Sequence, residues 1–513
     1  MTVPGNLYPY STTESIERDM RELRASFKSG VTRDLKARRQ VLLQLRKMLQ
    51  VGGKELSAAL RKDLHKGEIE CALMEVAVVD NEIQEHLDYM DDWAKPEKVS
   101  TNVVNLPGSS CIQRDPLGVV CIISTWNYPV QLTFQPLVGA ISAGNTVLLR
   151  LPGDDTCVHT NNAIIKLLDE YVDKRFVRYV HGDVEASKVM LDQRFDLIFC
   201  TGGTFIGKIV AAAAAKHLTP TILELGGKSP AIIDETCDLT VTVQRLAWAS
   251  LVNAGQTCVR PDYVLVSSKI GDKFVALLEK TLREFFGEDP QKSEDLCRLV
   301  NARQFERVAG ILIKDKAHIT FGGAMDAKDR YIEPTLLNFK GDFQTFRDAA
   351  CMGQEIFGPL LPIYYYETLD ECIDFINEHE KPLALYGYTS SSANREKILR
   401  ETSSGSVCIN DAIVQLTNSC LPFGGVGQSG MGSYHGKQSF DSFSHKKSVL
   451  VRSTWLDVKQ RYYPYKPSDM LILGPSLKPI TRKMITTLKS LAFAVGMSLI
   501  AVAIKFAVQS LGA

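Results

Sequence analysis

The chain contains two short apolar stretches, Gly118-Val-Val-Cys-Ile-Ile123 and Asn145-Thr-Val-Leu-Leu149, which read as buried strands. Two further stretches of this kind, Phe176-Val-Arg-Tyr-Val180 and Phe195-Asp-Leu-Ile-Phe-Cys200, follow them. The segments between them, such as 160–173, are helical spacers. Apolar strands that alternate with helices are typical of a parallel sheet covered on both faces. We therefore predict an α/β fold.

A second series of strand-like runs indicates a second α/β unit. Pro220 and Gly226-Gly227 interrupt the first pattern, which places a boundary between residues 219 and 228. A helical pattern also begins at Ile16, ahead of the first strand. The sequence thus favours two consecutive Rossmann-type domains behind a helical lead-in. The strand-like runs of the second unit are 231–233, 263–266, 319–321, 361–364 and 406–409.

The composition is that of a globular protein and excludes several functional classes. The 513 residues include 59 basic and 59 acidic side chains, and 45% of all residues are hydrophobic, which excludes a disordered or fibrous chain. The 12 cysteines form no CxxC pair or Cys/His cluster, so we expect reduced thiols and no metal site. No basic run offers a face for nucleic acid, and we expect no nucleic-acid partner. Residues 1–15 lack the pattern of a signal or transit peptide, which predicts a flexible start and synthesis in the cytosol.

The C-terminal segment differs in kind from the rest of the chain. From Met470 onwards it carries five basic residues and no acidic one. Between Lys489 and Lys505 lie 15 uncharged residues, which as a helix cover about 22 Å of the roughly 30 Å hydrocarbon core. Spanning a membrane requires the helix to continue to about Val508 with Lys505 at the far interface. We expect a tail anchor with a cytosolic catalytic body, and an in-plane amphipathic helix or an ordinary packed helix are the alternatives.

Two motifs carry the chemistry. Leu223-Glu224-Leu225-Gly226-Gly227-Lys228 is followed about 30 residues later by Asn253-Ala254-Gly255-Gln256-Thr257-Cys258. Thiol catalysis needs a thiolate, a base, and donors for a developing oxyanion. The cysteine and the glutamate meet two of these needs. Taken singly, the cysteine could also be a buried small hydrophobic residue, and the glutamate could be a carboxylate of an ordinary loop.

Taken together, the motifs resemble the aldehyde dehydrogenase superfamily. Ser124-Thr-Trp-Asn-Tyr-Pro-Val130 is similar to its oxyanion motif, Glu355-Ile-Phe-Gly-Pro359 to its nicotinamide-ribose motif, and Pro422-Phe-Gly-Gly-Val-Gly-Gln-Ser-Gly430 to its late glycine-rich segment. The resemblance extends from about residue 16 to 450. Within the superfamily the chain resembles the class 3 type, and its hydrophobic tail resembles that of the membrane-bound fatty aldehyde dehydrogenases. Class 3 signatures are Ala215–Pro220, Tyr434–His445 and Arg461–Tyr465.

The resemblance assigns three catalytic residues. Cys258 would attack the aldehyde to form a thiohemiacetal, and Asn127 would hold its oxyanion. Glu224 would activate the water that hydrolyses the later thioester. The implied reaction is the NAD(P)-dependent oxidation of medium- and long-chain aliphatic aldehydes to carboxylic acids. A phosphate-using acyl reductase, a thioesterase and a catalytically silent tethered scaffold are the alternatives.

A cofactor site is expected where a strand meets a helix. Thr201-Gly-Gly-Thr-Phe-Ile-Gly207 follows the strand that ends at Cys200, and the N–H groups of the helix start can bind a pyrophosphate. The resemblance adds Trp126 and Phe357 beside the nicotinamide and Glu355 at its ribose. The expected cofactor-binding residues are Gly202, Gly203, Thr204, Phe205, Ile206, Gly207, Arg150, Trp126, Glu355 and Phe357. The cofactor that the resemblance implies is NAD, and NADP is the alternative.

Three residues depart from the family pattern or have an open role. Arg150-Leu-Pro-Gly153 stands where the family usually has Lys-Pro-Ser-Glu, so Arg150 could bind the ribose while no carboxylate there repels a 2′-phosphate. Arg260 could lower the pKa of Cys258 or could pair with a carboxylate such as Asp262. His435 could take part in catalysis or have a structural or substrate-tunnel role.

These expectations divide the chain into segments and predict its partners. We expect a homodimer with an intersubunit arm near 110–115 and 433–451, and attachment to a membrane. The endoplasmic reticulum is the expected membrane, and the peroxisome and the mitochondrial outer membrane are alternatives. The expected segments are a flexible N-terminus (1–15), a lead-in and NAD(P)-binding domain (16–221), a catalytic domain (222–405), a return to the cofactor domain with the arm (406–455), a linker (456–485) and a membrane anchor (486–513).

Overall fold

The computed structural model describes residues 5–153, 156–455 and 457–477, with short stretches between 481 and 500. The chain forms two compact units. The larger unit consists of Met1–Lys95 and Arg114–Lys447, and the smaller unit consists of Pro96–Gln113 and Ser448–Ala513.

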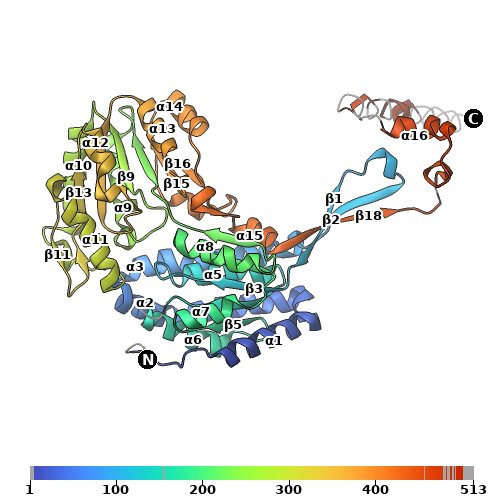
Figure 1. The fold of residues 1–513 in the computed structure, drawn as a ribbon, viewed down its shortest axis with the longest axis horizontal. Coiled ribbons are helices and arrows are strands. Elements are labelled where there is room, and N and C mark those ends of the chain that lie inside the picture. The colour runs from blue at the N-terminus through green and yellow to red at the C-terminus, as the bar shows by residue number, and fades with distance from the viewer. Residues whose placement is uncertain are drawn as a thin grey trace, which may run out of the picture. The chain divides into compact units, whose positions relative to one another are not determined.

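The first sheet of the larger unit contains the strands from which the fold was predicted (Figure 1). Its order is β17-β7-β6-β3-β4-β5, with all neighbours parallel except the antiparallel pair β17 and β7. The bounds are β3 (Val119–Ile123), β4 (Thr146–Arg150), β5 (Val177–Val180), β6 (Leu197–Thr201), β7 (Thr221–Glu224) and β17 (Gly430–Met431). The parallel α/β prediction is therefore confirmed for this part of the chain.

Both faces of the first sheet are covered, which explains the apolar runs in its central strands β3, β4 and β6. Val120 and Ile122 of β3 join one core cluster, and the alternate residues Val119 and Cys121 join another. Residues pointing to opposite faces of a strand must each be buried when helices cover both faces. The helices on the first face are α2 (Leu35–Leu64), α4 (Val78–Trp93), α5 (Gln131–Ser142) and α6 (Val158–Tyr171), and those on the second are α1 (Thr13–Ser29), α7 (Val184–Leu191) and α8 (Thr204–Ala215).

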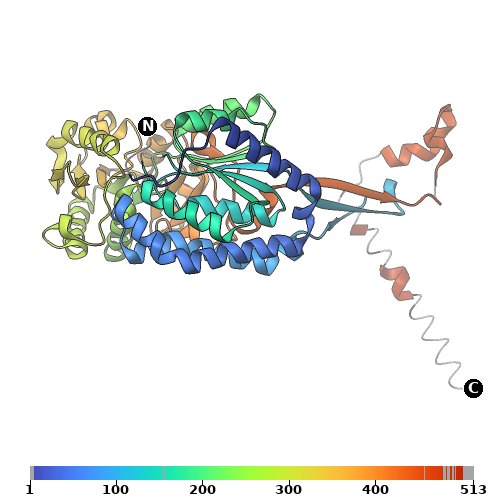
Figure 2. The ribbon, with the colours of Figure 1, turned by 90° about the horizontal axis from the view of Figure 1, so that it is seen from below.

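The helical lead-in is confirmed. Ile16, Met20 and Leu23 of α1 are buried against the first sheet. The long helix α2 runs alongside α6 (Figure 2). A short helix α3 (Glu68–Cys71) and a π-helical turn (Ala72–Ala77) connect α2 to α4.

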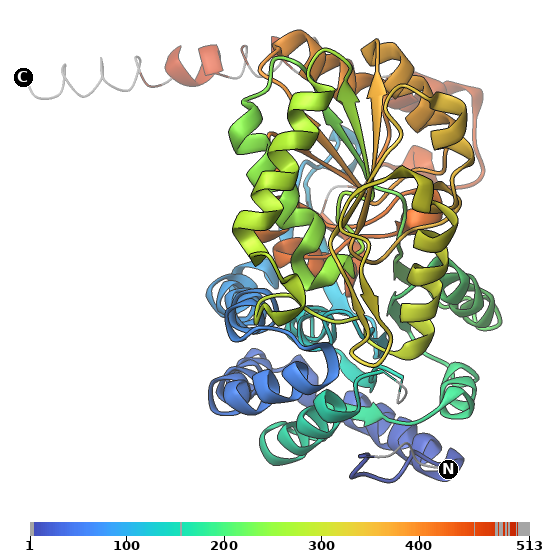
Figure 3. The ribbon, with the colours of Figure 1, turned by 90° about the vertical axis from the view of Figure 1, so that its left-hand side faces the viewer.

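The second sheet has seven strands in the order β10-β13-β14-β9-β8-β15-β16. Helices lie on both faces of it (Figure 3). Its strands are β8 (Pro230–Ile233), β9 (Tyr263–Ser267), β10 (Ile319–Phe321), β13 (Thr335–Asn338), β14 (Leu360–Tyr366), β15 (Ala384–Tyr388) and β16 (Ser406–Ile409). Its helices are α9 (Leu239–Leu251), α10 (Gly271–Phe286), α11 (Ala302–Lys314), α12 (Phe343–Asp348), α13 (Leu369–Glu378) and α14 (Ser392–Glu401).

The second sheet and the chain around it differ in two ways from the sequence prediction. The strands β13 and β15 were missed, as was the small hairpin β11 (Met325–Asp326) and β12 (Tyr331–Ile332). The strand β16 pairs with β15, so the chain leaves the second sheet after Ile409 rather than at residue 406. It rejoins the first sheet at β17 and continues into α15 (Gly436–Ser442).

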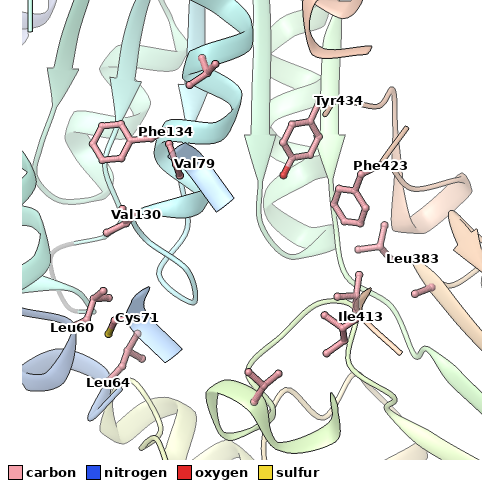
Figure 4. Packing of buried hydrophobic residues seen from close by; sticks show 14 of the residues in the cluster. Leu60, Leu64, Cys71, Val79, Val130, Phe134, Leu383, Ile413, Phe423 and Tyr434 are labelled. Atoms are coloured by element: carbon pink, nitrogen blue, oxygen red, sulfur yellow. The ribbon is translucent and has the colours of Figure 1, made fainter. Parts of the chain in front are cut away.

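One core cluster connects the two sheets of the larger unit. It contains Leu149 of β4 together with Ala231 and Val264 of the second sheet. Figure 4 shows part of it, with Phe423 beside Tyr434, whose ring centroids are 5.7 Å apart. Because this packing is continuous, the loops that connect the two sheets are supported by buried side chains of both.

The smaller unit contains most of a three-stranded sheet in the order β1-β2-β18. The strands are β1 (Glu97–Val99), β2 (Gly108–Pro116) and β18 (Ser444–Arg452), and β1 is antiparallel to β2. After β18 come two 3₁₀ turns and α16 (Met470–Leu477). The predicted anchor from Leu488 to Val508 lies mostly outside the described residues. Among the residues that are described, no helix has the length and apolar character needed to cross a membrane.

Candidate active site

A cavity of about 460 Å³ in the larger unit gathers the predicted catalytic residues. Cys258, Glu224 and Asn127 all line it. Glu224 is the last residue of β7, and Asn127 follows the end of β3. The carboxyl ends of adjacent parallel strands meet at one edge of a sheet, which is where α/β proteins bind ligands. Sheet topology therefore explains why residues 97 positions apart lie in one cavity.

The segment that leads to Cys258 has an unusual backbone. After α9 ends, Asn253 and Ala254 have φ values of 54° and 52°, and Gly255 has 74°. Non-glycine residues in this left-handed region are strained and persist only where the surroundings hold them. A Cβ on Gly255 would lie 2.4 Å from the carbonyl oxygen of Gly358, so only glycine fits there. The strained turn brings Cys258 to the cavity.

Asn127 is tied to the same segment. Its Nδ2 donates a hydrogen bond to the carbonyl oxygen of Gln256 at 3.1 Å. Asn253 Nδ2 donates in turn to the carbonyl oxygen of Asn127 at 2.8 Å. A side-chain amide has two N–H donors, so Asn127 can bond to Gln256 and still donate to an oxygen in the cavity.

Burial dominates the electrostatics of the cavity. Both carboxylate oxygens of Glu224 are buried and accept no hydrogen bond from the described residues, and burial raises the pKa of Glu224 well above its usual value. Burial also raises the pKa of Cys258 to about 12, with the nearby Glu355 and Glu224 carboxyls adding to the effect. Without a ligand the thiol of Cys258 is protonated at neutral pH.

Glu355 lies close to the turn that follows Glu224. A Cβ on Gly226 would be 2.1 Å from Glu355 Oε2, so glycine is required for this approach. Burial raises the pKa of Glu355 to about 8, and Asp262 contributes in the same direction. On the same wall, the Trp126 and Phe357 rings meet edge to face with centroids 5.3 Å apart.

The glycine turn after β6 has the features of a phosphate cradle. Gly202, Gly203 and Thr204 line the cavity, and α8 begins at Thr204 with no side chain capping its first N–H groups. A Cβ on Gly203 would contact nothing within 4 Å, so the space in front of the helix start is open. An open helix start of this kind fits the pyrophosphate of a dinucleotide.

The remaining residues of the turn lie around this cradle. A Cβ on Gly207 would be 2.7 Å from Leu225 Cδ2, so glycine allows α8 to pack closely on the chain after β7. Phe205 and Ile206 are exposed on α8. They do not line the cavity, and their predicted contact with a cofactor stays a prediction.

Arg150 lies outside the cavity and has several protein partners. Its Nε donates to Ser187 Oγ at 2.9 Å, and its Nη1 and Nη2 donate to the carbonyl oxygens of Leu151 and Gly182, each at 2.6 Å. These bonds tie the end of β4 to the chain after β5. A ribose contact from Arg150 stays a prediction, and it would have to compete with these bonds.

The two residues with an open role are both buried. Arg260 Nη1 lies 3.6 Å from Asp262 Oδ1 and donates to Gly358 O at 2.8 Å, so the expected pairing with Asp262 is present. His435 is outside the cavity, and its ring stacks on Phe423 with centroids 5.2 Å apart. Burial lowers the pKa of His435 to about 4, which leaves it neutral at physiological pH.

The sequence prediction missed three side chains of the cavity wall, namely Gln354 and two residues of α11, Gln304 and Arg307. Arg307 donates to Gln304 Oε1 at 2.9 Å and to the carbonyl oxygen of Ile356 at 2.7 Å. Polar residues on an amphipathic helix normally face water, so nothing in the local pattern identified them.

Comparison with known proteins identifies the family. Residues 6–449 match the aldehyde dehydrogenase family, and the chain belongs to it. It is 43% identical to the rat dimeric NADP-preferring aldehyde dehydrogenase over 89% of this chain and 99% of the rat protein. It is 44% identical to aldehyde dehydrogenase family 3 member A2 of Pongo abelii over 89% of this chain and 92% of that protein. The protein is thus an aldehyde dehydrogenase, an enzyme that oxidises aldehydes with NAD(P).

A solved structure supports the same assignment. The substrate-bound state of Staphylococcus aureus AldH matches with a TM-score of 0.87 and 38% identity, covering 90% of this chain and 99% of that one. The predicted fold class, two Rossmann-type α/β parts of the aldehyde dehydrogenase type, is confirmed.

The raised pKa of Cys258 makes its reactivity testable by alkylation of the cofactor-free protein. Below its pKa, the rate constant for iodoacetamide at Cys258 should rise about tenfold per pH unit from pH 7 to 9, because only the thiolate reacts. Glu355→Gln should raise the rate at pH 9, since an ionised carboxylate next to the thiol is removed. Peptide mapping by mass spectrometry measures the rate.

Glu306→Gln is the matched control, because Glu306 is an exposed carboxylate on α11. It should leave the rate unchanged. Alkylation of the exposed Cys420, measured in the same digest, shows that the reagent is active at each pH. A rate at Cys258 that is already flat between pH 7 and 9 would contradict the raised pKa.

Proposed function

We propose that this enzyme oxidises medium- and long-chain aliphatic aldehydes to carboxylic acids through a thioester on Cys258. The observation that carries the proposal is that Cys258, Glu224 and Asn127 line one cavity together with the glycine turn at 202–203. A nucleophile, a general base and a hydrogen-bond donor are the groups that covalent aldehyde oxidation requires.

The first step is attack of the Cys258 sulfur on the aldehyde carbon. The thiol releases its proton to solvent, the S–C bond forms, and the carbonyl π electrons move to oxygen to give a thiohemiacetal anion. We assign Asn127 Nδ2 and the backbone N–H of Cys258 as the donors to this oxygen. Donors of this kind each contribute about 10²–10³-fold to rate. The nicotinamide, when bound, supplies the hydride acceptor that turns the adduct into a thioester.

The second step is hydrolysis of the thioester, for which we assign Glu224 as the general base. It takes a proton from water while the water oxygen attacks the thioester carbon. The C–S bond then breaks with its electrons going to sulfur, the acid leaves, and the proton held by Glu224 passes to the sulfur of Cys258 or to solvent. Burial raises the pKa of Glu224, which makes its carboxylate a stronger base than an exposed one.

Two substitutions separate these steps. Cys258→Ser should lower kcat by about 10³-fold or more, because the thiolate nucleophile is lost. Glu224→Gln should still form the acyl adduct but release it slowly, since no base activates the water. NADH fluorescence measures turnover, and intact mass spectrometry detects the trapped thioester.

Cys420→Ser is the control for removing a thiol, because Cys420 is exposed and outside the cavity. Its kcat should match that of the unmodified enzyme. Near-normal turnover in Cys258→Ser would refute the nucleophile, and normal turnover in Glu224→Gln would refute the base. Release of acid from an acyl thioester substrate in the absence of NAD(P), without oxidation of aldehydes in its presence, would instead point to a thioesterase.

For the cofactor, we propose that the enzyme accepts both NAD and NADP. The segment Arg150–Gly153 after β4 contains no carboxylate that would repel a 2′-phosphate. The rat relative is named as NADP-preferring, which is consistent with this view. The cradle at Gly202–Thr204 suits the pyrophosphate that both cofactors share.

The ratio of kcat/KM for NAD to that for NADP tests this proposal. With no repelling carboxylate the two values should agree within about tenfold, a difference of ~1.4 kcal/mol. Initial rates with one aldehyde at saturating concentration give both constants. A preference for NAD of more than about 100-fold, or ~2.7 kcal/mol, would contradict it.

The long-chain substrate class rests on attachment to a membrane, which we propose for the C-terminal tail. The stretch between Lys489 and Lys505 contains no charged residue, and basic residues precede it. Long apolar aldehydes partition into lipid, so a tethered enzyme meets them there. We propose the endoplasmic reticulum as the membrane and a homodimer as the assembly, with the peroxisome and the mitochondrial outer membrane as alternatives. The word "dimeric" in the rat relative's name is consistent with the assembly.

Ending the chain at Lys489 tests the tail. The full-length enzyme should stay in the membrane pellet after carbonate extraction, whereas the shortened form should be released. Short aldehydes should be oxidised equally by both forms, because the described cavity residues are unchanged. Long aldehydes supplied in vesicles should be oxidised faster by the full-length form. Release of both forms by carbonate would contradict an anchor.

A further inference from the structure

Two charged side chains are completely buried beneath the loop that carries Asn127. Lys66 and Glu75 both have 0% side-chain exposure, and Lys66 Nζ lies 2.7 Å from Glu75 Oε1. Lys66 precedes α3, and Glu75 lies in the π-helical turn after it. Neither residue lines the cavity. Burying an ion pair is costly, and such a pair is often no more stable than apolar residues of similar volume.

Glu75 holds the start of α5. Its Oε2 accepts hydrogen bonds from the backbone N–H groups of Val130 and Gln131, both at 3.0 Å. The residue at the start of α5, Val130, has no side chain that can cap the helix. A carboxylate from a distant part of the chain therefore takes the place of the missing cap and interacts favourably with the helix dipole.

Lys66 holds the residues just before that helix. Its Nζ donates to the carbonyl oxygen of Asn127 at 3.2 Å and lies 4.1 Å from the centre of the Tyr128 ring. Although burial lowers the pKa of Lys66, the Glu75 and Glu70 carboxyls outweigh it, and the net shift is upward. Lys66 therefore carries its charge at neutral pH and can act as a strong donor.

The same loop is joined to the segment of Cys258. The Tyr128 hydroxyl bonds to Thr257 Oγ1 at 2.8 Å, next to Cys258 in sequence. The carbonyl oxygen of Asn127 thus accepts from both Lys66 Nζ and Asn253 Nδ2. The buried pair fixes one side of the loop, and the Asn253–Thr257 segment fixes the other.

We propose that Lys66 and Glu75 are positioning residues, which hold the Asn127 backbone so that its side-chain amide faces the reacting oxygen. The inference rests on the oxyanion role proposed above for Asn127. A catalytic donor must be held within about 0.5 Å of its productive place, and a misplacement of about 1 Å can cost about 10²-fold in rate. A pair that served stability alone would not affect the rate of the folded enzyme.

The test compares Lys66→Met, Glu75→Gln and the double variant by kcat, KM for the cofactor and thermal midpoint. Lys66→Met should lower kcat by about 10- to 100-fold while KM changes by less than about threefold, since the glycine turn is untouched. The double variant should recover thermal stability, because it leaves no unpaired buried charge. The kcat of the double variant should stay low, because the carbonyl oxygen of Asn127 still lacks the hydrogen bond from Lys66 Nζ.

Asp63→Asn is the matched control. Asp63 is a buried carboxylate of α2 that accepts from the backbone N–H groups of His159 and Thr160 at the start of α6, at 3.2 and 2.7 Å. It is the same kind of capping contact, but it supports the start of α6, whereas the loop with Asn127 leads into α5. This variant should lower the thermal midpoint while kcat stays within about threefold of normal, measured where the protein is folded.

A further set of variants, made in the Asn127→Ala enzyme, separates this inference from the role of Asn127 itself. In Asn127→Ala, adding Lys66→Met should change kcat by less than about threefold, because both changes remove the same interaction. Full additivity of the two effects, or recovery of kcat together with stability in the double variant, would overturn the positioning role. Loss of rate in Asn127→Ala with normal rate in Lys66→Met would overturn only the present inference, whereas normal rate in Asn127→Ala would overturn both.

Discussion

The carboxyl ends of β3, β6 and β7 lie at one edge of the first sheet because these three strands are adjacent and parallel. The residue that follows or ends each strand is thereby brought to the same place: Asn127 after β3, Gly202 after β6 and Glu224 at the end of β7. Cys258 arrives from the second sheet through a turn that exists only because Gly255 can approach Gly358. Strand direction and one missing side chain together determine the geometry of the cavity.

The cavity also sets the charge state of its ionisable groups. Burial raises the pKa of Cys258, Glu224 and Glu355 alike. Burial thus shifts all three groups toward their protonated, uncharged forms when the cavity holds no ligand, which disfavours several unpaired charges in one buried space. A positively charged ligand would favour their ionised forms, whereas a neutral ligand would not. The ionisation of the site is thus coupled to what it binds.

Much of this could be predicted from the sequence, for reasons that individual residues make clear. The strand β3 is apolar throughout, and β4 and β6 contain apolar runs, so their burial on both faces was evident. The strand β13 (Thr335–Asn338) has a polar residue at each end, and β15 contains Gly387, so neither has the pattern of a typical buried strand. Most of the cavity residues lie in glycine-rich motifs with a local signal. Arg307, Lys66 and Glu75 have none, because their contacts depend on segments far away in the sequence.

The antiparallel pairing of β17 with β7 has a consequence for biosynthesis. Leu223 and Glu224 pair with Met431 and Gly430, about 200 residues further along the chain. As the protein emerges from the ribosome, the outer edge of β7 stays without its partner strand until the whole second sheet has been made. Open strand edges invite pairing with other chains. Nascent chains interrupted between β7 and β17 would therefore be prone to association. The backbone around Glu224 would be among the last parts of the first sheet to become fixed.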